Sequence, residues 1–211
     1  MTAPLLRAEG LCLSYGNRHV LTMWDGAFAP GLTWLRGANG SGKSTLLKVL
    51  AGALEPFAGR RVAAGADAAT DPLGYRRQVF WCGPGAPAFD HLRAPEYFGF
   101  MATLYPRSAQ APLAEAVQGL GLGPFLEPRI AQLSSGNQRK VWLAAALAAG
   151  TPVVLLDEPF NALDAPSAAW LHEALARHAR AAAQAWVVAS HEAPAPGAPV
   201  ATLDLPLPRS A

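Results

Sequence analysis

Charged residues are scarce in this 211-residue chain, where Asp, Glu, Lys and Arg together make up 15% of the sequence. The formal net charge is only +2, the lysines are Lys43, Lys48 and Lys140 alone, and no basic run is present. Proteins that bind nucleic acid carry clustered positive charge that neutralises phosphates. The sequence therefore predicts no nucleic-acid partner.

Cysteines are few and long apolar runs are absent. Cys12 and Cys82 both lie in apolar, strand-like surroundings, which favours buried thiols in a reducing compartment over a disulfide or a metal site. The N-terminus lacks a basic region followed by an apolar core, so we expect no signal peptide. The longest apolar stretch, residues 141–156, is interrupted at Gly150 and Pro152, so we expect no membrane span. Docking onto a membrane protein stays compatible with these expectations.

Glycine recurs in one short stretch, residues 37–45, which has the sequence GANGSGKST. Glycines let backbone N–H groups point at phosphate oxygens, the lysine brings a cation to the outer phosphates, and the serine hydroxyl is a Mg²⁺ ligand. A strand-like run at 32–35 precedes this loop and a helix ending near Gly52 follows it, which is the context that the motif requires. The predicted nucleotide-binding residues here are Gly37, Asn39, Gly40, Ser41, Gly42, Lys43, Ser44 and Thr45.

Two acids and a histidine follow apolar runs typical of buried parallel strands, at residues 153–156 and 185–189. Asp157 ends the first run and is predicted to hold Mg²⁺ together with Ser44. Glu158, the next acid, is the candidate general base that orients and deprotonates the attacking water. His191 is expected at the same edge of the sheet, where it could contact the γ-phosphate or position the nucleophile.

Two further features leave alternatives open on residue chemistry alone. Tyr15 precedes the phosphate loop in a turn, where its ring could stack on adenine or simply be packed or exposed. Residues 133–138, LSSGNQ, form a Ser–Gly turn that opens a helix. Such a helix end can present N–H groups to an anion, although an ordinary N-cap is the simpler interpretation.

The order of elements predicts an α/β fold. Strands are expected at 5–14, 19–24, 32–35, 60–64, 78–82, 153–156, 185–189 and 200–205, with turns at 15–18 and 26–31 and a loop at 65–74. Helices are expected at 44–52, 94–105, 112–119, 123–127, 132–149 and 165–183. The helical segments between 87 and 141, roughly, are predicted to form an inserted subdomain.

Taken in this order, the motifs resemble the ATP-binding cassette (ABC) family of transporter ATPases over nearly the whole chain. Residues 37–45 resemble its Walker A motif, 153–159 its Walker B, 133–138 its signature, 161–164 its D-loop, His191 its switch histidine and Tyr15 its A-loop aromatic residue. The resemblance implies a single ABC ATP-binding domain over 1–211, with a P-loop NTPase core, an antiparallel β subdomain and an inserted helical subdomain. It also implies ATP and Mg²⁺ as cofactors. Two cassettes would pack head to tail, so that Ser134 and Gly136 of one contact the phosphate held by the other.

The chain departs from the family pattern in three places. Ser135 and Asn137 replace a glycine and the glutamine of the signature, and Ala145 stands where many relatives have arginine. The glutamine of the Q-loop is missing, since its place falls at or near Gly85. One lost hydrogen bond costs about 1–3 kcal/mol, whereas a lost general base costs about 10²- to 10⁴-fold in rate. Because Glu158 is present, we expect a working but slow ATPase whose signal to a partner is altered.

The resemblance implies an ATPase subunit that drives an integral membrane transporter, together with a second cassette of the same or another kind. The wording of residues 157–164 (DEPFNALD) and of 81–83 (WCG) is similar to the haem-exporter cassette of bacterial cytochrome c maturation, and residues 96–105 equally resemble other two-component exporters. Such a subunit would lie peripherally on the cytoplasmic face of the cell membrane. Phe89, Leu92 and Phe98 are candidates for the membrane-partner contact or for core packing. A dimerising ATP switch with weak hydrolysis is the alternative function.

Overall fold

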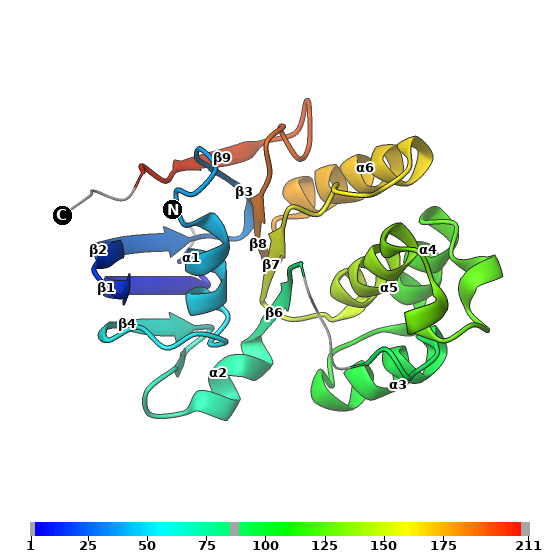
Figure 1. Cartoon of the computed structure of the whole chain (residues 1–211), viewed down its shortest axis with the longest axis horizontal. Coiled ribbons are helices and arrows are strands. Elements are labelled where there is room, and N and C mark those ends of the chain that lie inside the picture. The colour runs from blue at the N-terminus through cyan, green and yellow to red at the C-terminus, as the bar shows by residue number, and fades with distance from the viewer. Residues whose placement is uncertain (1–2, 85–88, 208–211) are drawn as a thin grey trace.

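The computed structural model of the protein describes residues 3–84 and 89–207. Two sheets and two groups of helices make up the chain (Figure 1). The strands are β1 (Leu6–Tyr15), β2 (Arg18–Phe28), β3 (Gly31–Arg36), β4 (Ala58–Ala63), β5 (Ala66–Asp67), β6 (Val79–Cys82), β7 (Val153–Asp157), β8 (Ala185–Ala189) and β9 (Val200–Asp204). The helices are α1 (Lys43–Leu50), α2 (Pro72–Gln78), α3 (Ala94–Leu104), α4 (Gln110–Gly119), α5 (Ser135–Ala148) and α6 (Ala165–Ala181), with 3-10 turns at Gly123–Phe125 and Ile130–Gln132.

The five-stranded sheet has the order β6-β7-β8-β3-β9, and its described strand pairs are all parallel. Every residue of β7 and β8 is buried, as expected for parallel strands covered on both faces. The carboxyl ends of β3, β7 and β8 lie next to one another, because Leu35 pairs with Ala189, which also pairs with Asp157. The three predicted site motifs therefore begin at one edge of this sheet.

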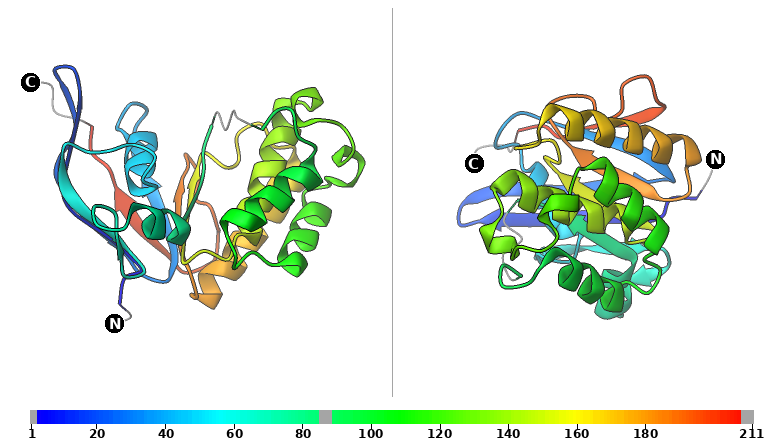
Figure 2. Two further views of the ribbon diagram at one scale, coloured as in Figure 1. Left: turned by 90° about the horizontal axis from the view of Figure 1, so that it is seen from below. Right: turned by 90° about the vertical axis from the view of Figure 1, so that its right-hand side faces the viewer.

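Successive side chains of the parallel strands point to opposite faces of the sheet, and each face packs into a separate hydrophobic core. Val154 and Leu156 pack with α5 and α6, whereas Val153 and Leu155 pack with α1 and the antiparallel sheet β2-β1-β4-β5. Figure 2 shows the antiparallel sheet on one side of the parallel sheet and helices α3, α4 and α5 on the other. Helix α1 thus follows the phosphate loop into a core between two sheets, which fixes the loop on a rigid base.

Four local predictions were wrong. The predicted loop at 65–74 contains β5 and the start of α2, because Asp71 caps that helix by accepting a hydrogen bond from the Gly74 backbone N–H at 2.9 Å. Gln78 ends α2 and does not begin β6. The turn predicted at 26–31 is shorter, since β2 continues to Phe28, and the helix predicted at 123–127 is a three-residue 3-10 turn.

Candidate functional site

The phosphate loop joins β3 to α1 and needs glycine at specific positions. Gly40 and Gly42 have φ angles of 78° and 98°, a region that other residues rarely adopt. A Cβ atom on Gly37 would lie 2.5 Å from Ser41 Oγ and 2.7 Å from the carbonyl oxygen of Leu205. The loop is therefore curled as closely as a phosphate-binding backbone requires.

Two basic side chains, Lys43 and Arg18, donate hydrogen bonds to backbone carbonyl oxygens of the phosphate loop. Lys43 is buried, and its Nζ donates to the carbonyl oxygens of Gly37 at 2.7 Å and Ala38 at 3.4 Å. Arg18, on β2, donates from Nη2 to the carbonyl oxygen of Gly40 at 2.9 Å. Lys43 was predicted from the motif. Arg18 was missed, because a single arginine after a turn carries no motif.

A pocket of about 480 Å³ opens over the loop. Its lining contains predicted site residues from four separate parts of the chain: Tyr15, Asn39, Gly40, Ser41, Gly42, Lys43, Ser44, Thr45, Glu158 and His191. Arg18, Val20 and Asn161 also line it and were not predicted as site residues. Arg18 and Val20 are two residues apart on β2, so their side chains lie on the same face of the strand, and Arg18 pairs with Tyr15 across β1 and β2. Tyr15 ends β1 and its side chain is 54% exposed at this pocket.

Asp157 is fully buried at the end of β7. Within the described residues, neither of its carboxylate oxygens has a hydrogen-bond partner. Burial raises the pKa of Asp157, and the Ser44 hydroxyl and the nearby cations Arg139, Lys48 and Lys43 oppose this rise. The Ser44 geometry falls short of a hydrogen bond to either oxygen. Burial thus disfavours the charged form of Asp157, as expected for a carboxylate whose charge is balanced by a bound cation.

The donors around Asp157 fit Mg²⁺. A carboxylate and a hydroxyl are oxygen ligands, and Mg²⁺ commonly takes only one or two protein ligands and completes its shell with water and phosphate oxygens. Among the described residues, no group of three or more His, Cys, Asp and Glu side chains could hold a metal ion. Ser44 and Asp157 would be a small set of oxygen ligands for such an ion beside the phosphate loop.

Glu158 and His191 lie next to one another in the lining of the pocket. His191 Nε2 lies 3.5 Å from Glu158 Oε1, and the backbone N–H of Glu158 donates to the carbonyl oxygen of Ala189 at 2.8 Å. Glu158 has a φ of 49°, in the left-handed region that is unfavourable for a side chain with a Cβ. The turn after β7 thus holds this carboxylate in a definite, strained conformation at the pocket.

Ser134 and Gly136 lie outside the pocket, at the start of α5. Ser134 is the N-cap of that helix, and its Oγ accepts a hydrogen bond from the Asn137 backbone N–H at 3.3 Å. The simpler N-cap interpretation thus describes Ser134 within one chain. The structure does not bring these two residues to Lys43, which is expected if they serve a second cassette. The Q-loop position predicted at Gly85 lies outside the described residues.

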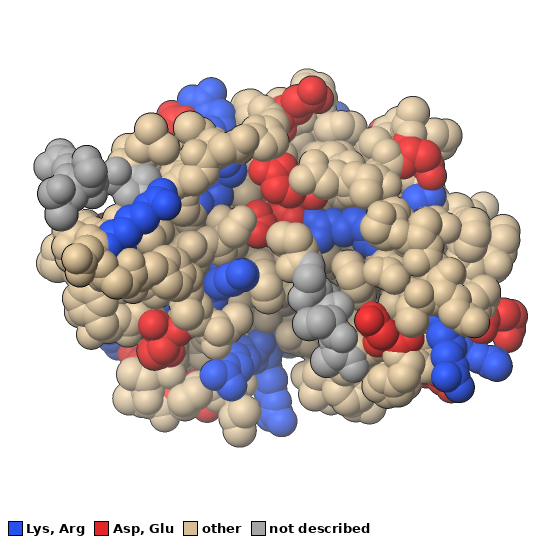
Figure 3. Space-filling view, viewed as in Figure 1, with Lys and Arg blue, Asp and Glu red and all other residues tan. Residues whose placement is uncertain are grey.

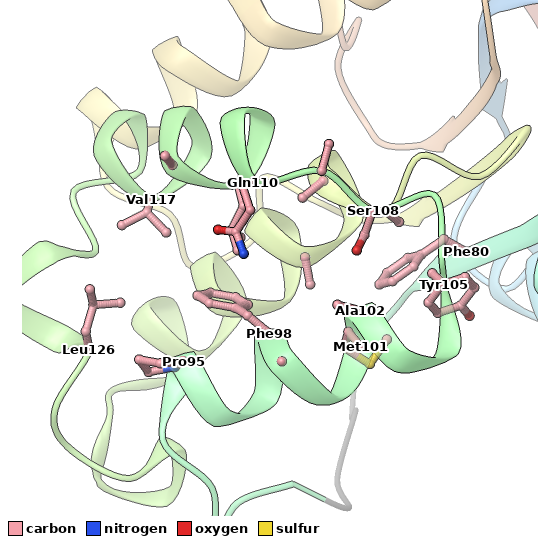
Figure 4. A pocket seen from close by; sticks show the side chains of 17 residues that line it. Phe80, Pro95, Phe98, Met101, Ala102, Tyr105, Ser108, Gln110, Val117 and Leu126 are labelled. Carbon is pink, nitrogen blue, oxygen red and sulfur yellow. The ribbon is translucent and has the colours of Figure 1, made fainter.

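A second cavity, of about 440 Å³, lies between α3, α4 and α5, away from the phosphate loop (Figure 4). Its wall is largely apolar, with Phe98 from α3, Tyr105 at the C-terminal end of that helix and the small side chain of Ala145 from α5. Phe98 is buried, while Phe89 packs on Tyr97 with a centroid distance of 5.4 Å. Core packing thus accounts for Phe98. This cavity has none of the ionisable groups that phosphate chemistry requires.

Comparison with known proteins places the site in a family context. A family model described as ABC transporter matches residues 28–161. The chain is 33% identical over 174 residues to the cytochrome c biogenesis ATP-binding export protein CcmA of Pseudomonas putida KT2440, covering 82% of this chain and 83% of that protein. It is 37% identical over 209 residues to the CcmA protein of Cupriavidus necator H16, covering 95% of this chain and 88% of that protein.

Solved structures show the same fold. The ATP binding subunit of an ABC transporter superposes with a TM-score of 0.79 at 26% identity, over 89% of this chain and 79% of that chain. The bacterial ABC transporter cassette MJ0796, in its dimeric form, superposes with a TM-score of 0.81 at 22% identity, over 97% of both chains. The predicted α/β cassette fold is confirmed. Within the described residues, no helix combines the length and apolar character of a membrane span.

Proposed function

This chain belongs to the ABC transporter family, and on that premise we propose that it is the ATP-hydrolysing subunit of a membrane exporter of the cytochrome c biogenesis type. The whole of 1–211 is proposed to be one ABC ATP-binding domain. Relatives that carry the name of a cytochrome c biogenesis export protein, over more than four fifths of both chains, support the exporter type. The observation that carries the proposal is the convergence of Lys43, Glu158 and His191 on one pocket.

The phosphate loop and Lys43 are proposed to bind the triphosphate of ATP. The Lys43 ammonium, which donates to two loop carbonyl oxygens, can exchange these partners for phosphate oxygens. The positive φ angles of Gly40 and Gly42 let the loop backbone curl so that its N–H groups can turn toward the phosphates. The Tyr15 ring, half exposed at the pocket, is placed to stack on adenine.

Ser44 and Asp157 are proposed to hold Mg²⁺, which when bound neutralises phosphate charge that develops during hydrolysis. Glu158 then acts as the general base: its carboxylate accepts the proton of the attacking water. His191, at 3.5 Å from that carboxylate, orients Glu158 and contributes a hydrogen-bonding group on the phosphate side of the pocket. Burial of Asp157 keeps the electrostatic interactions in this region strong.

A complete site is proposed to need a second cassette, of the same or another chain. Ser134 and Gly136 would approach the γ-phosphate held by the partner's loop, and the α5 N-terminus would add its backbone N–H groups and positive dipole end. The membrane partner is proposed to be an integral transporter subunit, which would hold this protein peripherally at the cytoplasmic face of the cell membrane.

The small net charge of the chain favours a protein partner over a nucleic-acid partner. On the face shown in Figure 3, basic side chains occur in small groups among acidic and uncharged ones. With a formal net charge of +2, the chain has too little positive charge for the phosphate contacts that dominate nucleic-acid binding.

A dimerising ATP switch with weak hydrolysis is the second candidate function, favoured by the missing glutamine at the Q-loop position near Gly85. Steady-state ATP turnover separates the two candidates. An ATPase predicts that Glu158→Gln lowers kcat by about 10²- to 10⁴-fold while ATP affinity is retained. Equal turnover in the wild-type protein and in this variant would leave the switch as the function. For the transporter assignment, the protein should sediment with membranes only when its membrane partner is co-expressed.

A further inference from the structure

The first two turns of α5 are attached at three points to the segment that follows β7. Gly136 lies so close to this segment that a Cβ atom would be 2.4 Å from the carbonyl oxygen of Ala162. Lys140, buried, pairs with Asp164 through an Nζ–Oδ2 distance of 2.5 Å. Arg139 donates to the backbone carbonyl oxygens of Asp157 and Glu158, at the start of the same segment. The start of α5 and residues 157–164 therefore behave as one packed unit.

Arg139 makes the attachment closest to the chemistry. Its side chain is buried, with a relative exposure of 6%, and its Nη2 donates to two successive carbonyl oxygens, that of Asp157 and, at 2.8 Å, that of Glu158. Hydrogen bonds from a charged donor are about twice as strong as neutral ones. A buried guanidinium that bonds to successive carbonyls fixes the orientation of the peptide units that carry the proposed Mg²⁺ ligand and the proposed base.

The conformation at Glu158 shows why such a restraint is needed. A non-glycine residue with φ near 49° is held against an intrinsic cost of about 1–2 kcal/mol. Without external bonds, the peptide unit would relax toward negative φ, and the Cα–Cβ direction would turn with it. The Arg139 bond to the Glu158 carbonyl, together with the bond from the Glu158 N–H to Ala189, holds both sides of this residue.

We propose that Arg139 is a positioning residue that sets Glu158 for catalysis and links it to the signature end of α5. The inference rests on the proposed role of Glu158 as general base. Ser134 and Arg139 are five residues apart on one helix, or about 7.5 Å along its axis. A second cassette whose bound ATP contacts Ser134 therefore acts on helix α5, and Arg139 in the next turn of this helix is hydrogen-bonded to the backbone of Glu158. When Ser134 of this chain closes over the ATP held by the partner, Arg139 thus positions Glu158, the base for the ATP held by this chain.

Arg139→Gln tests the proposal because it removes the charge and the reach of the guanidinium. We expect kcat to fall by about 10- to 100-fold, since a misplacement of about 1 Å in a catalytic group costs this much. The Kd for ATP, measured by fluorescence titration without Mg²⁺, should change by less than about twofold, because Arg139 is absent from the pocket lining. Arg139→Lys, which keeps the charge and one donor, should recover part of the loss.

The matched control is Arg177→Gln. Arg177 pairs with Glu115 at 2.5 Å between α6 and α4, far along the chain from the phosphate loop. This variant loses a guanidinium, as Arg139→Gln does, together with an ion pair between two helices, so that any general effect of loosening the helices appears in it. We expect its kcat to stay within about twofold of the wild-type value, because exposed ion pairs contribute little.

A double-mutant cycle gives the decisive readout. If Arg139 acts through Glu158, then Arg139→Gln should leave the residual turnover of Glu158→Gln unchanged within about twofold. An equal loss in both backgrounds, a parallel rise in the ATP Kd, or the same kcat loss in Arg177→Gln would overturn the proposal. Should Arg139→Gln not fold, Arg139→Lys completes the same cycle. Failure of the proposed function looks different, because Glu158→Gln alone would then turn over like the wild type.

Discussion

Asp157→Asn should stabilise the nucleotide-free protein while removing its response to Mg²⁺. The Asp157 carboxylate is fully buried, and neither oxygen has a hydrogen-bond partner among the described residues. Its pKa is raised by burial despite the nearby cations, so the folded environment disfavours the charged form. Asparagine has nearly the same shape and no charge. The substitution therefore removes the desolvation cost of the buried Asp157 carboxylate, which lowers the stability of the wild-type protein.

The size of this effect follows from the desolvation of unpaired polar groups. A buried polar group without partners costs about 1–3 kcal/mol, and more when it is charged. The amide of asparagine retains part of that cost, so we expect a net gain in unfolding free energy of about 1–2 kcal/mol. For a chain of this length each kcal/mol shifts Tm by about 2–4 °C, which predicts a rise of about 2–8 °C at pH 7.

The pH dependence has a definite sign. Because the folded-state pKa is raised, the penalty on the Asp157 carboxylate is fully present above that raised pKa. It disappears as pH falls through the raised pKa to the ordinary value near 3.8, since the carboxyl is then neutral in both states. The Tm difference between Asp157→Asn and the wild type should therefore shrink as pH is lowered from 7 toward 4. Taking the difference cancels the titration of the other acids.

Differential scanning calorimetry in EDTA measures these differences, and Asp204→Asn is the control. Asp204 is exposed and pairs with Arg36 at 2.8 Å, which lowers the pKa of its carboxyl, so neutralising it should not raise Tm. With ATP present, adding Mg²⁺ should raise the wild-type Tm further, whereas the Tm of Asp157→Asn should not respond to Mg²⁺. A lower Tm for Asp157→Asn at pH 7, or a Tm difference that is constant with pH, would refute this reasoning.

Three further substitutions test other parts of the site and fold. Gly37→Ala should weaken ATP binding by at least about tenfold in a fluorescence titration, because its Cβ would meet backbone 2.7 Å away. Tyr15→Ala should weaken ATP binding about fivefold, equivalent to about 1 kcal/mol of stacking, whereas Tyr15→Phe should bind as the wild type does. Gly119→Ala should lower Tm by about 2–12 °C without changing ATP affinity, because its Cβ would lie 1.9 Å from the Trp170 ring and overpacking costs about 1–3 kcal/mol. An unchanged Tm in that variant would contradict the tight α4–α6 contact.

Elements with a strong local pattern were predictable from the sequence. The continuous apolar runs of β7 and β8 identify buried parallel strands, and the parallel arrangement then places Glu158 and His191 at one edge. Helix α2 was missed although Asp71 and Pro72 form an N-terminal capping signal, because Gly65 and Gly74 favour a loop. Burial of Tyr75, which is 1% exposed, stabilises the helix despite these glycines.

Residues that act through tertiary contacts left no local signal. Arg18 reaches Gly40 across 22 positions, and Arg139 reaches Asp157 across 18. An arginine on a strand or early in a helix is compatible with an exposed position, so neither could be placed before the fold was known. The left-handed conformation of Glu158 is likewise imposed by contacts from β8 and α5.

Isothermal titration calorimetry of ATP with Mg²⁺, into the wild-type protein and Lys43→Ala, tests the central claim most directly. The account predicts one bound ATP per chain for the wild type and a large loss of affinity for Lys43→Ala, whose missing ammonium is the cation at the phosphate loop. No heat of binding to the folded wild-type protein, or equal affinity in the two proteins, would contradict it.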